Sequence, residues 1–543
     1  MRRILITLAC AGLAALVVAS TASADTRYSV GIGSRSIAVD PDGNYHGLPV
    51  YLGGFGLGGP PIGNRHATGN LGLGPSVRAI SIGDGTHNFA IADIEAQGWF
   101  AATKDGPLGL VDMRKAVEAA THGALKAGEV VIQSDHTHGG PDMMGVWGGA
   151  PLAYRQFAFR QTVDAIVDAF NSRQKGTLWY GTAPGVVPAT GERLLNNQFD
   201  YDSANKVMDS DVRVLQARDA TGRAFATMLN FSAHATVLGS SNTKATGDWP
   251  QTTNPMLEEA FGGKAMTVVG TLGRTQPNRP GCQTPGLQGD AASLCALDVY
   301  SRRVVDAAKV AVANAKPMPG GKAVVATESF LITDPASNPL LLGMLYGGAL
   351  VGIPINRSMT PPFMTGNVIG TITASARIGN VLLSSGPGEM YPQIPLKVRA
   401  LMPRIGGYMT AGLANDQLGY LIAPFEAYPE PIKTSFFDSS FLNGDQIQAC
   451  IDSQGATCDP GNPTPDPIGN DNYFFNVSHT MGERVTCSLL RGAGDLFKRG
   501  SAPRDAYDRC ALFVNDALLG PGFDVDNPIP TAPAVPSSLP PLP

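Results

Sequence analysis

The chain has 543 residues, a formal net charge of −5 at pH 7 and only 16% charged residues. It contains no basic stripe or arginine-rich segment, so we expect no binding to nucleic acid. The length suits two or more domains, and the 43% of hydrophobic residues are enough for a substantial core.

Residues 1–24 have the pattern of a secretory signal peptide. Met1-Arg2-Arg3 precedes an apolar stretch, and Ala22-Ser23-Ala24 provides a small-residue cleavage site. No later run reaches the roughly 18 apolar residues of a spanning helix, so we expect no transmembrane segment. These features predict an exported protein, either secreted or periplasmic.

The cysteines agree with export. Cys10 lies in the predicted signal peptide, and the other six of the seven cysteines form an even set, which indicates disulfides in an exported chain. Local pairing is the simplest of the connectivities that six cysteines allow. It joins Cys282 to Cys295, Cys450 to Cys458 and Cys487 to Cys510.

Strands and helices are predicted to alternate along most of the chain. Apolar runs predict strands over 77–82, 88–94, 130–134, 212–217, 224–231, 266–270 and 381–384. Apolar residues at helical spacing predict helices over 110–126, 159–170 and 297–315, and from 394 onward. This pattern indicates an α/β fold, with mixed β-sheets flanked by helices.

The predicted domain organisation has three parts after the signal peptide. Residues 25–440 form the α/β domain, 441–526 form a small extension that carries four cysteines, and 527–543 form a proline-rich disordered tail. The glycine-rich residues 53–59 are interpreted as an ordered loop, because aromatic and apolar residues are embedded in them. Residues 339–354 are the most apolar internal stretch. They are either a buried helix or a helix that lines an apolar substrate entrance and contacts a membrane surface.

Residues 134–142 carry the strongest chemical signal. His136 and His138 follow a buried strand and are two residues apart, so their side chains point to the same face. Imidazole is the commonest metal ligand, although an isolated pair of this kind is more often found in a surface loop. By default His234, after the strand 224–231, is a core residue, and Glu389 is an acid favoured at the start of a helix.

Five motifs in this order resemble the neutral, non-lysosomal ceramidase family. They are His136-Thr137-His138-Gly139-Gly140-Pro141, Asn230-Phe231-Ser232-Ala233-His234-Ala235-Thr236, Gly273-Arg274-Thr275-Gln276-Pro277-Asn278, Pro387-Gly388-Glu389, and the loop from Gly412 to Tyr420. The likeness covers roughly 28–428. It implies a zinc amidohydrolase that cleaves the N-acyl bond of ceramide, a lipid amide.

The resemblance also assigns roles to individual residues. The implied zinc ligands are His136, His234, Glu389 and Tyr420, a donor set that suits Zn²⁺. Zinc would acidify water and polarise the scissile carbonyl. The implied catalytic groups are His138 as acid and base, with Arg193 and the backbone N–H of Gly56 for the oxyanion. Direct ligation by His138 remains an open variant.

One departure from the family lies at Gln276, which stands where the family has an active-site serine. An amide can donate a hydrogen bond but cannot attack or relay a proton. Thr275 is one position off and supplies the nearest hydroxyl. Two alternatives therefore stay open: the same zinc fold acting on another acyl amide or ester, and a catalytically impaired relative that binds lipid.

Overall fold

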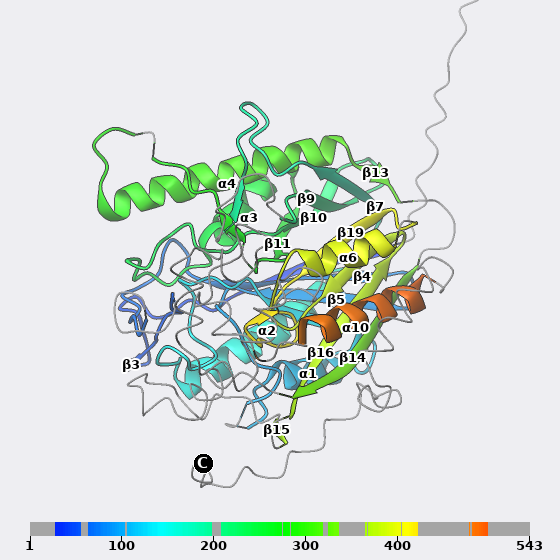
Figure 1. Ribbon diagram of the computed structural model, residues 1–543, viewed down its shortest axis with the longest axis horizontal. Coiled ribbons are helices and arrows are strands. Elements are labelled where there is room, and N and C mark those ends of the chain that lie inside the picture. The colour runs from blue at the N-terminus through cyan, green and yellow to red at the C-terminus, as the bar shows by residue number, and fades with distance from the viewer. Residues whose placement is uncertain are drawn as a thin grey trace, which may run out of the picture.

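All but one of the strands of a large mixed sheet come from the first 270 residues (Figure 1). Its order is β11-β10-β9-β7-β1-β4-β5-β6, with β13 beside β7. Neighbours are antiparallel except β10 with β11 and β5 with β6, which are parallel. The strands are β1 (Tyr28–Ser36), β4 (Ser76–Gly83), β5 (Asn88–Ile94), β6 (Val130–Ser134), β7 (Gln174–Ala183), β9 (Val212–Arg218), β10 (Ala224–Phe231), β11 (Lys264–Val269) and β13 (Lys316–Pro317).

The structure is a computed structural model. It describes residues 28–55, 63–103, 106–197, 208–273, 275–282, 284–318, 324–335, 364–365, 368–402, 404–421, 477 and 481–497. The predicted signal peptide, the stretch 339–354 and the predicted tail therefore lie outside the described residues, as does Gly56.

A second, smaller sheet packs against the first. Its order is β14-β16-β17-β19, with β15 beside β16. Apolar side chains from both sheets form one buried cluster, in which Ile80 and Phe89 of the large sheet join Leu383 of the small one. The strands are β14 (Val325–Pro335), β15 (Met364–Thr365), β16 (Val368–Ile378), β17 (Val381–Ser385) and β19 (Gly407–Ala411).

Helices cover the outer faces of both sheets, which gives four layers (Figure 1). On the large sheet, α1 (Leu110–Ala120) and α2 (Leu152–Asn171) cover one half, and α3 (Asp248–Phe261) and α4 (Gly289–Ala313) cover the other. On the small sheet, α6 (Gln393–Leu401) and α10 (Met481–Leu496) close the core. The expectation of mixed sheets flanked by helices is confirmed.

Three two-stranded ribbons and one short helix complete the described elements. The ribbons are β2 (Asn44–Tyr45) with β3 (Leu48–Pro49), β8 (Leu195–Asn197) with β12 (Thr275–Pro277), and β18 (Glu389–Met390) with β20 (Tyr420–Leu421). The 3₁₀ helix η1 (Ala127–Glu129) precedes β6. The last two ribbons carry candidate site residues.

The prediction of a helix over 110–126 is wrong at its end, because α1 stops at Ala120. The hydroxyl of Thr121 donates to the carbonyl of Val117 and accepts from the N–H of Leu125, which closes the chain into a turn. His122 and Gly123 then adopt positive φ angles, which a continuing right-handed helix excludes.

The predicted disulfide between Cys282 and Cys295 is confirmed, and it closes the loop before α4. Cys487, on α10, is also disulfide-bonded. Helix α10 belongs to the range 441–526, and it packs on the small sheet rather than standing apart from it.

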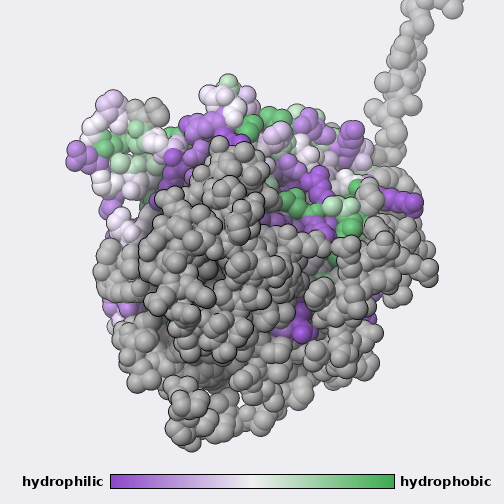
Figure 2. Space-filling view, in the orientation of Figure 1, coloured by the Kyte–Doolittle hydropathy of each residue, from purple (hydrophilic) through white to green (hydrophobic). Residues whose placement is uncertain are grey.

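Within the described part of the chain, no helix combines the length and apolar character that crossing a membrane requires. Along the upper edge of the molecule, where α3 and α4 lie in Figure 1, hydrophilic and hydrophobic side chains are intermingled (Figure 2).

Candidate metal centre

The histidines of the candidate site follow the ends of two strands of the large sheet, β6 and β10. Strand β6 ends at Ser134, and His136 follows with a φ of 60°, a left-handed conformation that is uncommon for a residue with a side chain. Strand β10 ends at Phe231, three residues before His234. The ring nitrogens of His136, His138 and His234 lie within 4.8 Å of one another, so the sequence-predicted histidines are brought together.

Glu389, in the short strand β18, contacts two of these three histidines. Its Oε1 lies 3.3 Å from Nε2 of His136, and its Oε2 lies 3.2 Å from Nε2 of His234. The phenol of Tyr420 also donates a hydrogen bond to this carboxylate, which is only 4% exposed. Three of the four residues expected to be zinc ligands therefore meet at the carboxylate of the fourth, Glu389.

Backbone carbonyls fix both imidazoles from behind. Nδ1 of His136 donates to the carbonyl of Gln97 at 2.6 Å, and Nδ1 of His234 donates to the carbonyl of Thr275 at 2.7 Å. A carbonyl can only accept, so each Nδ1 carries a proton, and each ring is turned so that its Nε2 faces Glu389. This carbonyl–imidazole arrangement is the one that orients metal-binding histidines in proteins.

The donor set fits a zinc ion. Ligands at about 2.0–2.1 Å from a tetrahedral zinc lie about 3.3 Å from one another, and the two N···O separations are 3.3 and 3.2 Å. Burial lowers the pKa of His136, which favours the neutral imidazole that a metal needs. Burial alone would raise the pKa of Glu389, but His136, His234 and Tyr420 bring that pKa below its ordinary value, which favours the carboxylate.

Residues 271–273 and 275–278 support two of these residues at once. The carbonyl of Thr275 accepts hydrogen bonds from both the backbone N–H and the ring of His234. Gly273 lies directly on the backbone of Glu389, since a Cβ at this glycine would come 2.6 Å from the Glu389 carbonyl oxygen. The predicted hydroxyl donor Thr275 is thus buried, and its carbonyl, not its side chain, reaches the site.

Gln276 faces the other way from Thr275 in the short strand β12. Its Oε1 accepts a 2.7 Å hydrogen bond from the hydroxyl of Thr236, and its side chain is partly exposed. The amide is therefore held in one orientation beside the segment that carries His234. Arg193 has an exposed side chain, and its carbonyl accepts a hydrogen bond from Asn278. Its role at the oxyanion stays a prediction.

His138 is surrounded by groups that the sequence did not single out. The Phe55 ring lies 4.4 Å from the His138 ring, centre to centre, and the amide of Gln97 approaches the imidazole at 3.4 Å. Arg65 donates a short hydrogen bond to the carbonyl of His138. Burial, then the neighbouring His136, His234 and Arg65, hold the pKa of His138 well below its ordinary value.

An apolar cluster packs against Gly54, the residue before Phe55. Phe100, Met144, Val146 and Trp147 form a buried cluster of their own. Trp147 touches Gly54, where a Cβ would come 2.1 Å from the indole nitrogen, and Met144 touches Gly98 in the same way. The carboxylate of Asp142 accepts four backbone N–H groups between Met144 and Gly149, and so holds the loop in place.

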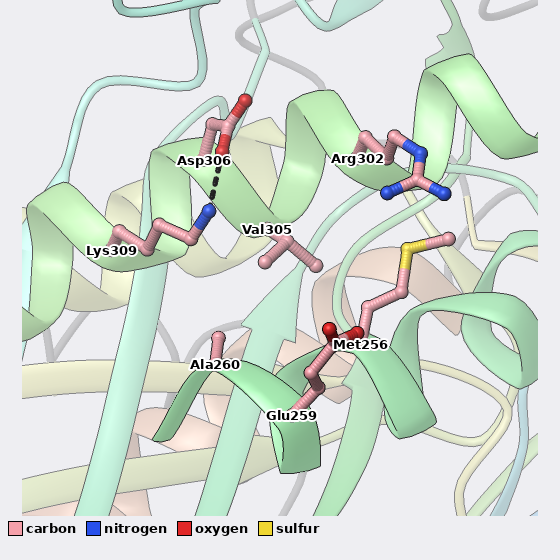
Figure 3. A pocket seen from close by; sticks show the side chains of 7 residues that line it. All are labelled: Met256, Glu259, Ala260, Arg302, Val305, Asp306 and Lys309. Atoms are coloured by element: carbon pink, nitrogen blue, oxygen red, sulfur yellow. Dashed lines mark hydrogen bonds and ion pairs between the residues drawn. The ribbon is translucent and has the colours of Figure 1, made fainter.

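The structure also contains a surface groove away from these residues (Figure 3). It has a volume of about 430 Å³ and lies between α3 and α4, where Met256 and Val305 alternate with charged side chains such as Glu259 and Lys309. Lys309 is held by Asp306 at 2.8 Å. The groove is lined by none of the candidate site residues.

Neither a protein-family model nor a curated protein sequence matches this chain. Solved structures do. The neutral ceramidase from Pseudomonas aeruginosa is similar with a TM-score of 0.61 and 15% identity, over 88% of this chain and 77% of that one. A ceramidase structure described as complexed with C2 is similar with a TM-score of 0.61 and 14% identity, over 88% of this chain and 76% of the other. At this identity the likeness concerns the fold.

Proposed function

Because this chain has the neutral ceramidase-like fold, we propose that it is an exported, zinc-dependent amidohydrolase. The proposed substrate is ceramide or a related lipid amide, which would be split at its N-acyl bond into a fatty acid and an amine such as a sphingosine-like base. The disulfide between Cys282 and Cys295 supports an oxidising compartment outside the cytoplasm.

The observation that carries the proposal is the pair of imidazoles on one carboxylate. His136 and His234 each present Nε2 to a different oxygen of Glu389, while backbone carbonyls hold their other nitrogens. His136, His234, Glu389 and Tyr420 would hold the metal. When bound there, zinc would polarise the scissile carbonyl and acidify water at the site.

The remaining residues would handle the substrate and the proton. His138 lies within 4.8 Å of the other two histidines, measured between ring nitrogens, so it can take a proton from water and return it to the leaving amine. The apolar cluster of Phe100, Met144, Val146 and Trp147 contacts the backbone at Gly54, one residue before the Phe55 ring that lies on His138, and it suits an acyl chain. Arg193 and the N–H of Gly56 are the proposed oxyanion donors.

A second candidate function keeps the metal but changes the substrate. Gln276 replaces a hydroxyl with an amide, and Thr236 holds that amide in one orientation. This observation favours an acyl amide or ester other than ceramide, or lipid binding with little turnover.

The test combines metal analysis with a substrate panel. We expect about one zinc per chain in the purified protein, and loss of both zinc and fatty-acid release in His234→Ala. Short- and long-chain ceramides, simple N-acyl amines and matched acyl esters should be assayed on the same samples. Release of fatty acid from the amides but not the esters supports the amidohydrolase.

A matched control separates loss of metal from loss of folding. His87 is an exposed histidine in the hairpin before β5, so His87→Ala should retain both zinc and turnover. Bound zinc without turnover on any substrate would support the metal site but refute the proposed hydrolase activity. Absence of bound zinc, together with activity that survives chelation, would refute the metal dependence.

A further inference from the structure

Arg65 is a buried cation beside the candidate site, and no carboxylate neutralises it. The residue is only 3% exposed, and within the described ranges no acidic side chain lies within ion-pair distance of its guanidinium. Burial lowers its pKa to about 10, so it remains charged at neutral pH. Buried charges are normally paired, because desolvation makes an uncompensated one costly.

Backbone carbonyls take the place of a counter-ion. The two terminal nitrogens of Arg65 donate to the carbonyls of Gly53, His138, Ser240 and Asn242, and its Nε is buried without a partner. These dipoles solvate the guanidinium but leave its full positive charge in place. The charge therefore acts on whatever occupies the site.

The position of Arg65 directs that charge toward His138. Its guanidinium carbon lies 5.1 Å from the centre of the Phe55 ring, and that ring in turn lies 4.4 Å from the ring of His138. One terminal nitrogen of Arg65 is also bonded to the carbonyl of His138. In a dry, low-dielectric region an interaction over such distances is screened far less than in water.

We propose that Arg65 makes the site at His138 selective for a carboxylate that carries an apolar tail. The negative charge of the ligand's carboxylate would be attracted by the guanidinium of Arg65, which has no acidic partner within the described ranges. The apolar tail would pack on the cluster of Phe100, Met144, Val146 and Trp147. This cluster contacts Gly54, next to the Gly53 carbonyl that Arg65 binds. The inference deepens the proposed function, because a fatty acid is one of its two products, and it predicts that this product binds and inhibits.

The experiment compares a charged ligand with a neutral ligand of the same length. Binding of decanoate and of 1-decanol is measured by calorimetry near neutral pH, on protein as purified and on protein treated with a chelator. We expect tighter binding of decanoate in both preparations. Arg65→Met should weaken decanoate about tenfold and change decanol by less than roughly twofold. Arg65→Lys keeps the charge and should retain most of the preference.

Arg78 provides a matched control. Its side chain is 18% exposed and, unlike that of Arg65, is paired with a carboxylate, that of Glu258. Arg78→Met should therefore leave the ratio of decanoate to decanol affinity unchanged. Equal weakening of both ligands in Arg65→Met would overturn the proposal. If that variant does not fold, the chelator-treated wild type decides, since equal affinity for decanoate and decanol there would also overturn it.

The two proposals fail separately. Preferential binding of decanoate without any hydrolysis would leave the role of Arg65 intact and remove the amidohydrolase. Hydrolysis of lipid amides by a protein that shows no preference for decanoate would support the amidohydrolase and remove the proposed role of Arg65.

Discussion

Glu389 and Tyr420 lie opposite each other in the parallel ribbon of β18 and β20, and the phenol of Tyr420 donates a hydrogen bond to the Glu389 carboxylate. Directly opposed residues of neighbouring strands project to the same face. The ribbon therefore works as a template that presents two oxygen donors together, about thirty residues apart in sequence.

Tyr420→Phe removes one of these oxygens and keeps the ring. We expect zinc affinity and kcat/KM to fall about 10- to 100-fold, because the carboxylate loses a hydrogen-bond donor and the metal loses a ligand. Zinc titration and steady-state kinetics measure the two effects. The control is Tyr391→Phe, whose ring lies 6.4 Å from that of Tyr420. A Tyr420→Phe protein with unchanged zinc affinity would show that the phenol is not a ligand.

Gly273→Ala should disturb the site through the backbone. The added Cβ would come 2.6 Å from the carbonyl oxygen of Glu389, a contact that real Cβ atoms do not make. We expect a loss of about 1–3 kcal/mol of stability together with weaker zinc binding, measured by urea unfolding and zinc titration. Gly281→Ala is the control, because its Cβ would meet nothing within 4 Å. Equal effects of the two substitutions would contradict this account.

Stability should fall as the pH rises from about 4.5 to 7. Burial raises the pKa of Glu95 from its ordinary value of 4.5 to about 7. Over that interval the unfolded chain has released this proton and the folded chain still holds it, so folding becomes less favourable with rising pH. The difference corresponds to about 3 kcal/mol. Glu95→Gln should flatten the pH profile of urea unfolding in this window, and an unchanged slope would exclude Glu95 as its source.

Substitutions at Gln276 separate its two hydrogen-bonding roles. Gln276→Glu has the same shape and can still accept from Thr236, but its carboxylate donates nothing. We expect kcat/KM on lipid amides to fall about tenfold. Gln276→Ser restores a hydroxyl and should raise the hydrolysis of ceramide relative to other amides. Thr236→Val removes the group that orients the amide and should give part of the Gln276→Glu effect. Identical substrate profiles for all variants would place Gln276 outside the reaction.

The fold could be predicted where apolar residues alone decide the structure. Strands β5 and β10 match the predicted ranges of 88–94 and 224–231, because both are almost continuously buried. Helix α3 was missed, since Pro250 lies in its first turn and Pro255 inside it, and both suggest a break. Strand β1 is not among the predicted strands, because glycines interrupt its apolar pattern. There Gly31 and Gly33 lie where a Cβ would collide with the backbone of α2.

The candidate site was predictable only in part, because its support comes from backbone groups. The resemblance identified His136, His234, Glu389 and Tyr420, and the structure brings these four together. Every residue has a backbone carbonyl, so the sequence does not show which one accepts a hydrogen bond. The contact between the Gln97 carbonyl and His136 could therefore not be predicted. Arg65 gave none either, because its partners are also carbonyls, and its significance depends on the absence of an acidic neighbour within the described ranges.

The four donors at Glu389 come from positions 136, 234, 389 and 420, spread over more than half of the chain. A nascent chain that ends before Tyr420 lacks at least one of these four residues. Such a chain therefore has an incomplete set of donors for the proposed metal, and the set becomes complete only when the ribbon of β18 and β20 has formed. Under the proposed function, full binding of the metal would therefore come late in folding, and a chain in which this ribbon has not formed would bind the metal more weakly.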